Sequence, residues 1–162
     1  TGSSYMGFAV SALLASAVAD APRYSIAFTG DGSFMMNPQI LIDAVEHGLR
    51  GMIVIFDNRR MSAISALQTA QYGADYKTDD RIEVEYTRLA ESVHGVKGFD
   101  GGTSSGELRD ALEAGYAHNG LSIVQVPVYY GDDEMGGLGV FGQWNVGNWC
   151  ENVQREKHDI GL

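Results

Sequence analysis

Cysteine, basic residues and long apolar runs are all scarce in this chain of 162 residues. Cys150 is the only cysteine, which excludes an internal disulfide and a cysteine cluster for zinc, and favours a reducing, cytoplasmic location. Only 11 basic residues stand against 21 acidic ones, and they form no patch, so we do not expect nucleic acid as a partner. The longest apolar stretch, around residues 8 to 19, is short and interrupted by serines, which argues against a membrane span.

The composition that remains, 44% hydrophobic and 20% charged, is typical of one globular domain with a buried core. We assign residues 1–128 to this domain. It begins at Thr1 in a Gly/Ser-rich segment, so we expect it to lack its N-terminal start. Residues 129–162 are rich in Gly, Trp and Asn, and we expect them to form a C-terminal arm packed on this domain or a neighbouring one.

Two kinds of apolar pattern alternate along residues 1–128. Continuous apolar runs predict buried strands at residues 24–29, 52–56, 96–99 and 121–128. Segments between them predict helices at residues 8–19, 38–47, 86–94 and 105–118. Ser104 and Glu107 have the spacing of a capping box at the start of the last helix. This alternation predicts an α/β fold of three layers, with a parallel sheet between helices on both faces.

Two polar residues stand just past predicted strands, Asp31 in a Gly-Asp-Gly turn and Asn58 after "VIFD". Ligands of open parallel sheets bind at the carboxyl ends of the strands, so the two residues could lie side by side. Their oxygens suit Mg²⁺ or Ca²⁺ better than zinc. Gly30 and Gly32 free the backbone to turn tightly, and the N–H groups after Asp31 could cradle an anion. A cation beside such a cradle suits a diphosphate.

Other interpretations of this turn remain open at this point. Gly-Asp-Gly alone is a common turn, and a non-catalytic α/β module could use Asp31 to bind a cation. Such a module would not need Asn58. A dinucleotide-binding domain fits less well, because the turn lacks the G-x-G-x-x-G pattern.

The combination of "GDGSFMMN" with "VIFDN", in which Asn58 follows Asp31 after a predicted helix and strand, resembles the metal and diphosphate motif of thiamine-diphosphate-dependent enzymes. The resemblance runs from "SSYMGFAVSALLASA" to "LSIVQVPV" and is to the diphosphate-binding domain of the acetolactate synthase-like branch. It implies thiamine diphosphate and Mg²⁺ as cofactors. The implied metal ligands are Asp31, the side chain of Asn58 and the backbone carbonyl of Arg60.

The same resemblance implies a set of contacts to the organic cofactor. Met6 would prop it into a bent shape, and the backbone of Ser4 would meet the aminopyrimidine. Ile64 and Leu67 belong to a segment that would run under the thiazolium, and they would line the wall of the substrate pocket. The remaining cofactor contacts come from the first motif: Gly30, Asp31, Gly32 and Ser33, with Asn58 from the second.

The resemblance also implies what the enzyme would do. It would make or break a carbon-carbon bond next to a carbonyl of a 2-oxo acid or related small molecule, as a lyase or transferase. "GDGSFMM", "AISALQ" and "GQWNVG" are similar to the ring-opening hydrolase of a cyclic 1,2-diketone in inositol catabolism. Asp57 stands where acetolactate synthases usually have a second Asn, and Asp occurs there in the hydrolase-like group; Leu67 stands where acetolactate synthases usually have tryptophan, which counts against simple acetolactate synthesis.

In the family, the glutamate that activates the cofactor comes from a separate pyrimidine-binding domain, commonly on another subunit. We find no match for that glutamate and assign no catalytic residue to this chain. We therefore expect half of an active site, inactive without a pyrimidine-binding domain or subunit, in a dimer or other homo- or hetero-oligomer.

Overall fold

The computed structural model describes residues 5–78 and 82–128, so the predicted C-terminal arm at 129–162 lies outside the described residues. Within them the chain forms two compact units. The first combines residues 5–58 with residues 83–128, and the second contains residues 59–78 and 82. No helix in the described part of the chain is long and apolar enough to cross a membrane.

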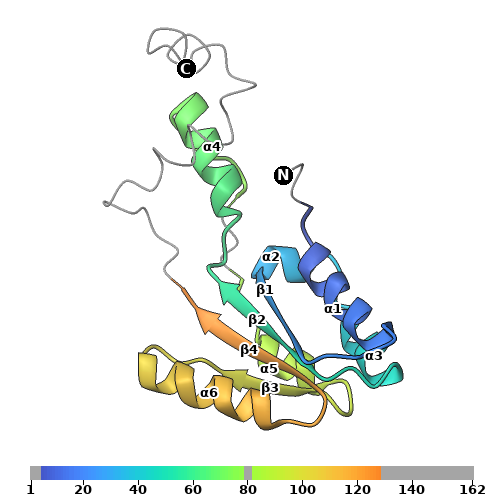
Figure 1. Ribbon diagram of the computed structural model, residues 1–162. Coiled ribbons are helices and arrows are strands. Elements are labelled where there is room, and N and C mark those ends of the chain that lie inside the picture. The colour runs from blue at the N-terminus through green and yellow to red at the C-terminus, as the bar shows by residue number, and fades with distance from the viewer. Residues whose placement is uncertain (1–4, 79–81, 129–162) are drawn as a thin grey trace, which may run out of the picture. The chain divides into compact units, whose positions relative to one another are not determined.

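The first unit is built on a parallel sheet of four strands in the order β1-β2-β4-β3 (Figure 1). The strands are β1 (Ser25–Gly30), β2 (Gly51–Asp57), β3 (Lys97–Asp100) and β4 (Leu121–Pro127). The helices of this unit are α1 (Phe8–Val18), α2 (Asp31–Phe34), α3 (Ile40–Glu46), α5 (Tyr86–Glu91) and α6 (Ser105–Ala117). The predicted parallel sheet and its order of elements are confirmed, with most ends within two or three residues.

Successive side chains along the strands point to opposite faces of the sheet, and each face packs in its own hydrophobic core. On one face, Ile53 and Ile55 of β2 pack with apolar residues of α1, α3 and α5. On the other face, Met52 and Val54 pack with Val124 of β4 and with α6. A strand that is buried on both faces needs a continuous apolar sequence, which is why "MIVIF" predicted β2 correctly. Helices therefore cover both faces, as expected.

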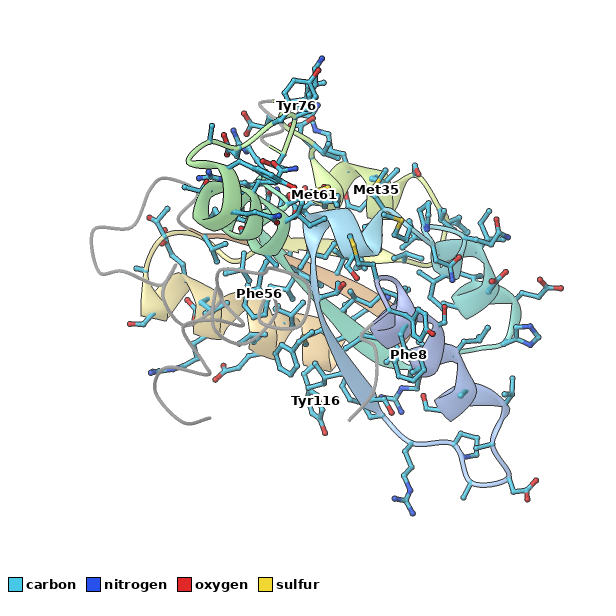
Figure 2. All side chains as sticks on the ribbon, turned by 90° about the horizontal axis from the view of Figure 1, so that it is seen from above. Phe8, Met35, Phe56, Met61, Tyr76 and Tyr116 are labelled. Carbon is cyan, nitrogen blue, oxygen red and sulfur yellow. The ribbon has the colours of Figure 1, made fainter. Side chains whose placement is uncertain are left out.

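Within the described residues, part of the sheet face that packs on α6 is left exposed. Ile26 and Phe28 of β1 pair with Met52 and Val54 and so lie on this face, with 47% and 61% of their surfaces exposed. Phe56, near the end of β2, lies on the same face and is 40% exposed (Figure 2). The rings of Phe28 and Phe56 stack with centroids 6.2 Å apart. Among the described residues, α6 packs instead against β2, β3 and β4.

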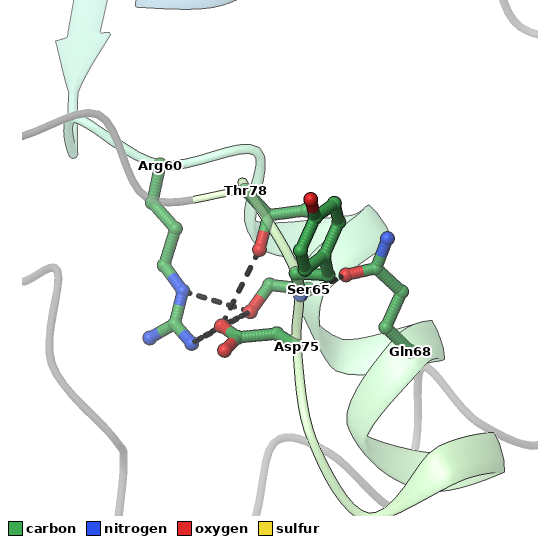
Figure 3. Close-up of polar contacts among 6 residues, drawn as sticks. Arg60, Ser65, Gln68, Asp75 and Thr78 are labelled. Atoms are coloured by element: carbon green, nitrogen blue, oxygen red, sulfur yellow. Dashed lines mark hydrogen bonds and ion pairs between the residues drawn. The ribbon is translucent and has the colours of Figure 1, made fainter.

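The second unit contains α4 (Ser62–Tyr72), which is held to the following loop by a polar cluster (Figure 3). The guanidinium of Arg60 donates to the carboxylate of Asp75, with Nη2 2.7 Å from Oδ2. The hydroxyl of Ser65 donates to the same oxygen at 2.6 Å, and that of Thr78 at 3.3 Å. These donors lower the pKa of Asp75, the Ser65 hydroxyl having the largest effect and the Arg60 guanidinium the next.

Helix α6 begins with the predicted capping box. The backbone N–H of Glu107 donates to the Ser104 hydroxyl oxygen at 3.3 Å. In return the Glu107 carboxylate accepts the backbone N–H groups of Thr103 and Ser104, each at 3.0 Å. The first N–H groups of a helix have no carbonyl in their own helix, so these bonds satisfy groups that would otherwise need water.

Ser104→Ala is expected to lower the free energy of unfolding by about 1 kcal/mol, because it removes the capping hydroxyl. Urea unfolding followed by circular dichroism measures this loss. The matched control is Ser105→Ala, an exposed serine one position further into the helix, which is expected to be nearly neutral. Equal losses in the two variants would contradict the capping role.

The pKa of Asp75 is expected to lie below its ordinary value of 3.8 in the folded chain. A lowered pKa means that the charged carboxylate contributes stability above pH 3.8, and that this contribution is lost as the pH falls through the lowered value. Ser65→Ala should move the titration midpoint back upward, because it removes the strongest donor. Carboxyl-carbon NMR measures the midpoint, and Gln71→Ala, on the exposed side of α4, is the control. An unchanged midpoint in Ser65→Ala would refute this account.

Candidate functional site

The two turns that the sequence singled out leave the same edge of the sheet. Asp31 follows the last residue of β1 and begins α2, and Asn58 follows the last residue of β2. β1 and β2 are parallel neighbours, with Gly30 paired to Phe56. Parallel neighbours are spaced about 4.8 Å apart, so the register brings the starts of both turns together. Asp31 and Asn58 each also interact with other groups of the protein.

The segment before α1 packs directly on α2. The backbone N–H of Gly7 donates to the Ser33 hydroxyl oxygen at 2.8 Å. Gly7 has a φ of 87°, and a Cβ there would lie 3.2 Å from the Cβ of Met36, so a larger residue would be both strained and crowded. A Cβ on Gly32 would lie 3.6 Å from the Cε of Met6. Met6 therefore lies against the Gly-Asp-Gly turn.

A pocket of about 410 Å³ opens beside this turn. Its volume falls in the range of small-molecule sites, which is roughly 300–1,000 Å³. The lining combines aromatic side chains with the turn: Tyr5, Phe8, Ala9, Phe28, Thr29, Gly30 and Ser33. The sequence predicted Gly30 and Ser33 as binding residues but not the aromatic ones, whose ring positions depend on how α1 and β1 approach each other.

A polar contact that the sequence did not predict ties down the end of β2. Asp57, with 4% of its surface exposed, accepts a hydrogen bond from the side-chain amide of Gln125 on β4, with Nε2 2.9 Å from Oδ2. The carbonyl of Asp57 accepts the backbone N–H of Val128 at 3.0 Å. The only signal in the sequence was one amide inside the apolar run "LSIVQVPV".

The predicted site residues are thus divided between the units. Met6, Gly30, Asp31, Gly32, Ser33 and Asn58 belong to the first unit, at one edge of its sheet. Arg60 and Ile64 belong to the second, where the Arg60 guanidinium is bound to Asp75 and Ile64 is partly exposed. Ser4 and the side chain of Leu67 lie outside the described part of the structure.

In the described ranges, no three His, Cys, Asp or Glu side chains gather closely enough to hold a metal ion. A zinc-type or carboxylate-rich site is therefore absent from this part of the chain. The ligand set implied by the resemblance is of another type, since it contains one carboxylate, one amide and one backbone carbonyl.

Residues 1–126 match the family described as "Thiamine pyrophosphate enzyme, C-terminal TPP binding domain". Among curated proteins, the chain is 31% identical over 133 residues to 3D-(3,5/4)-trihydroxycyclohexane-1,2-dione hydrolase from Bacillus subtilis (strain 168), covering 78% of this chain and 21% of the relative. The corresponding Listeria monocytogenes serotype 4b (strain F2365) protein is 28% identical over 153 residues, covering 90% and 23%.

The fold is also similar to that of a solved thiamine diphosphate-dependent enzyme. A thiamine diphosphate-dependent 4-hydroxybenzoylformate decarboxylase from Rhodococcus jostii RHA1 superposes with a TM-score of 0.70 at 20% identity, covering 79% of this chain and 24% of that one. The chain thus spans about a fifth of the length of the curated relatives it matches. By its sequence and its fold, the chain belongs to the thiamine pyrophosphate enzymes, within their C-terminal domain that binds thiamine pyrophosphate.

Proposed function

We propose that this chain supplies the Mg²⁺- and diphosphate-binding half of a thiamine-diphosphate-dependent active site. The observation that carries the proposal is the register of β1 and β2. Because of this register, the turns that contain Asp31 and Asn58 begin next to each other, at the carboxyl ends of the two strands. The match to the thiamine pyrophosphate family supports this function over that of a non-catalytic cation-binding module.

The donor set fits Mg²⁺. Asp31 would contribute a charged oxygen and Asn58 a neutral one, both hard ligands of the kind that Mg²⁺ takes. The backbone carbonyl of Arg60 would be the third protein ligand. The guanidinium of Arg60 has a separate role, since it binds the Asp75 carboxylate within the second unit. Mg²⁺ commonly keeps few protein ligands and completes its octahedron with phosphate oxygens and water.

The surroundings of the turn fit the organic cofactor. Gly32 leaves room beside Met6, and Gly30 has no atom within 4 Å of where its Cβ would be, so the backbone can approach a phosphate closely. The Ser33 hydroxyl accepts from Gly7, and a hydroxyl that accepts one hydrogen bond can also donate its own hydrogen, here to a phosphate oxygen. Ser4 and Ile64 are proposed to complete the cofactor contacts, and Leu67 to line the wall of the substrate pocket.

When bound, thiamine diphosphate supplies a carbon nucleophile that attacks a carbonyl and stores electrons while a carbon-carbon bond is made or broken. The residues of this chain would bind and orient that group, and Met6 would hold it in a bent shape. We assign no proton transfer to a side chain here. The activating acid would come from a pyrimidine-binding domain or subunit, since the relatives are several times longer than this chain.

Two substrate classes follow from these relationships. A 2-oxo acid would suit an acetolactate synthase-like lyase or transferase, and the structurally similar protein from Rhodococcus jostii RHA1 is named as a 4-hydroxybenzoylformate decarboxylase. A cyclic 1,2-diketone would suit a ring-opening hydrolase. The curated relatives carry that hydrolase name and Asp57 stands where acetolactate synthases usually have Asn, so these observations favour the diketone.

Asp31→Asn is expected to weaken binding of the divalent cation in the presence of thiamine diphosphate by roughly 100-fold or more, since even residues outside the ligand set contribute about 10–100-fold. Mn²⁺ serves as the probe, because the electron paramagnetic resonance signal of the free ion measures binding directly. The matched control is Glu46→Gln on α3, which removes the same charge from an exposed position. Equal affinity in Asp31→Asn and wild type would refute the metal site.

The substrate class is tested by replacing the matching region of the Bacillus subtilis hydrolase with this chain. If the diketone assignment is correct, the chimera should open the trihydroxycyclohexane-dione ring and leave pyruvate unchanged. Decarboxylation of pyruvate without ring opening would instead favour the 2-oxo acid. A chimera that binds thiamine diphosphate and Mg²⁺ but acts on neither compound would contradict both substrate classes.

A further inference from the structure

The side-chain amide of Gln125 holds the end of β2, and both its oxygen and its nitrogen are hydrogen-bonded. Gln125 stands in β4 opposite Ile55, on the sheet face that packs against α5. Its Nε2 donates to Asp57 at 2.9 Å and to the carbonyl of Val84 at 3.2 Å. Its Oε1 accepts the backbone N–H of Tyr86 at 3.0 Å. Rotating the amide by 180° would set an oxygen against two acceptors and an NH₂ against a donor, so only one orientation works.

The same contacts reach the other turn of the site. Tyr86, which is 5% exposed, begins α5 and packs its ring edge-on against Phe34, with centroids 5.7 Å apart. Phe34 is the last residue of α2, the four-residue helix that Asp31 begins. A continuous set of contacts therefore runs from α2 through Tyr86 and Gln125 to Asp57, the residue before Asn58.

Within the described residues, the side chain of Asp57 is bonded to the neutral amide of Gln125 and not to a lysine or arginine. Buried polar groups must be hydrogen-bonded, and removing one partner costs the desolvation of the other. The carboxylate thus has a fixed position only while Gln125 donates to it. Asp57 immediately precedes Asn58, so a shift of Asp57 would move the point from which Asn58 leaves the strand.

We propose that Gln125 is a positioning residue for the metal site, acting through Asp57 to hold Asn58 and through Tyr86 to hold the helix that begins with Asp31. This inference rests on the proposed function, because it concerns the cation that Asp31 and Asn58 would bind. It gives the Asp57 side chain a structural role as an acceptor. By this account the charge of Asp57 is not required, and the amide of Gln125 is.

The direct test is Gln125→Glu, which sets carboxylate oxygens against Asp57 and Val84. Its affinity for Mn²⁺ in the presence of thiamine diphosphate is expected to fall about tenfold or more, the size seen for residues that orient metal ligands. Asp57→Asn keeps an oxygen that accepts from Gln125, so its affinity should stay within about threefold of wild type, which corresponds to less than about 0.7 kcal/mol.

A matched control separates positioning from general stability. Ser122 lies in the same strand, is fully buried, and donates to the carbonyls of Gly51 and Gly115. Ser122→Ala should lower the free energy of unfolding without changing the Mn²⁺ affinity measured well below the melting temperature. If Ser122→Ala loses as much affinity as Gln125→Glu, or if Asp57→Asn does, the positioning role is refuted.

Hydrogen exchange in the metal-free chain gives a second readout that does not need a bound cofactor. The N–H of Val128, bonded to the Asp57 carbonyl, should exchange at least about tenfold faster in Gln125→Glu and Gln125→Ala than in wild type and Asp57→Asn. Unchanged exchange in both Gln125 variants would overturn this inference, whether or not the wild-type chain binds Mn²⁺. If the wild-type chain does not bind Mn²⁺ in the presence of thiamine diphosphate, that result would refute the proposed function instead.

Discussion

The parallel pairing of β1 with β2 is the constraint on which the candidate site depends. Ser25 pairs with Gly51 and Gly30 with Phe56, and this register sets where both turns begin. Gly51 allows the pairing to start, because a Cβ there would lie 2.7 Å from the carbonyl oxygen of Ser25. A slip of one residue would exchange the two faces of β2, both of which are buried in separate cores. The cores thus fix the register, and the register fixes the positions from which Asp31 and Asn58 start.

Much of the fold was predictable because its signals are local. The continuous, β-branched apolar run "MIVIF" is typical of a strand covered on both faces in a parallel sheet, and Ser104 with Glu107 has the spacing that marks a helix start. The placement of Asp31 and Asn58 at the carboxyl ends of neighbouring strands was predictable for a related reason, since each directly follows an apolar run that forms a parallel strand. The helix expected over 86–94 ends sooner, at Glu91, before the turn that leads into β3.

The rest of the site could not be predicted because its contacts join distant parts of the sequence. Nothing near Gln125 indicates that it bonds Asp57, which is 68 positions away. The aromatic lining of the pocket depends on α1 meeting the end of β1, which brings Tyr5 and Phe8 to Phe28. The ion pair of Arg60 with Asp75 was not predicted either, because the resemblance implies a role for the backbone carbonyl of Arg60 and none for its guanidinium.

The bond between positions 57 and 125 restricts which residues can occupy them together. A buried carboxylate at 57 accepts only, so its neighbour must donate, and the glutamine amide does so while its oxygen accepts from Tyr86. An asparagine at 57 could donate as well as accept, and would therefore tolerate either an amide or a carboxylate at 125. Two carboxylates would repel each other in a buried position. The identity of residue 57 alone is then an incomplete guide to the substrate, because it is also set by the residue two strand positions before the end of β4.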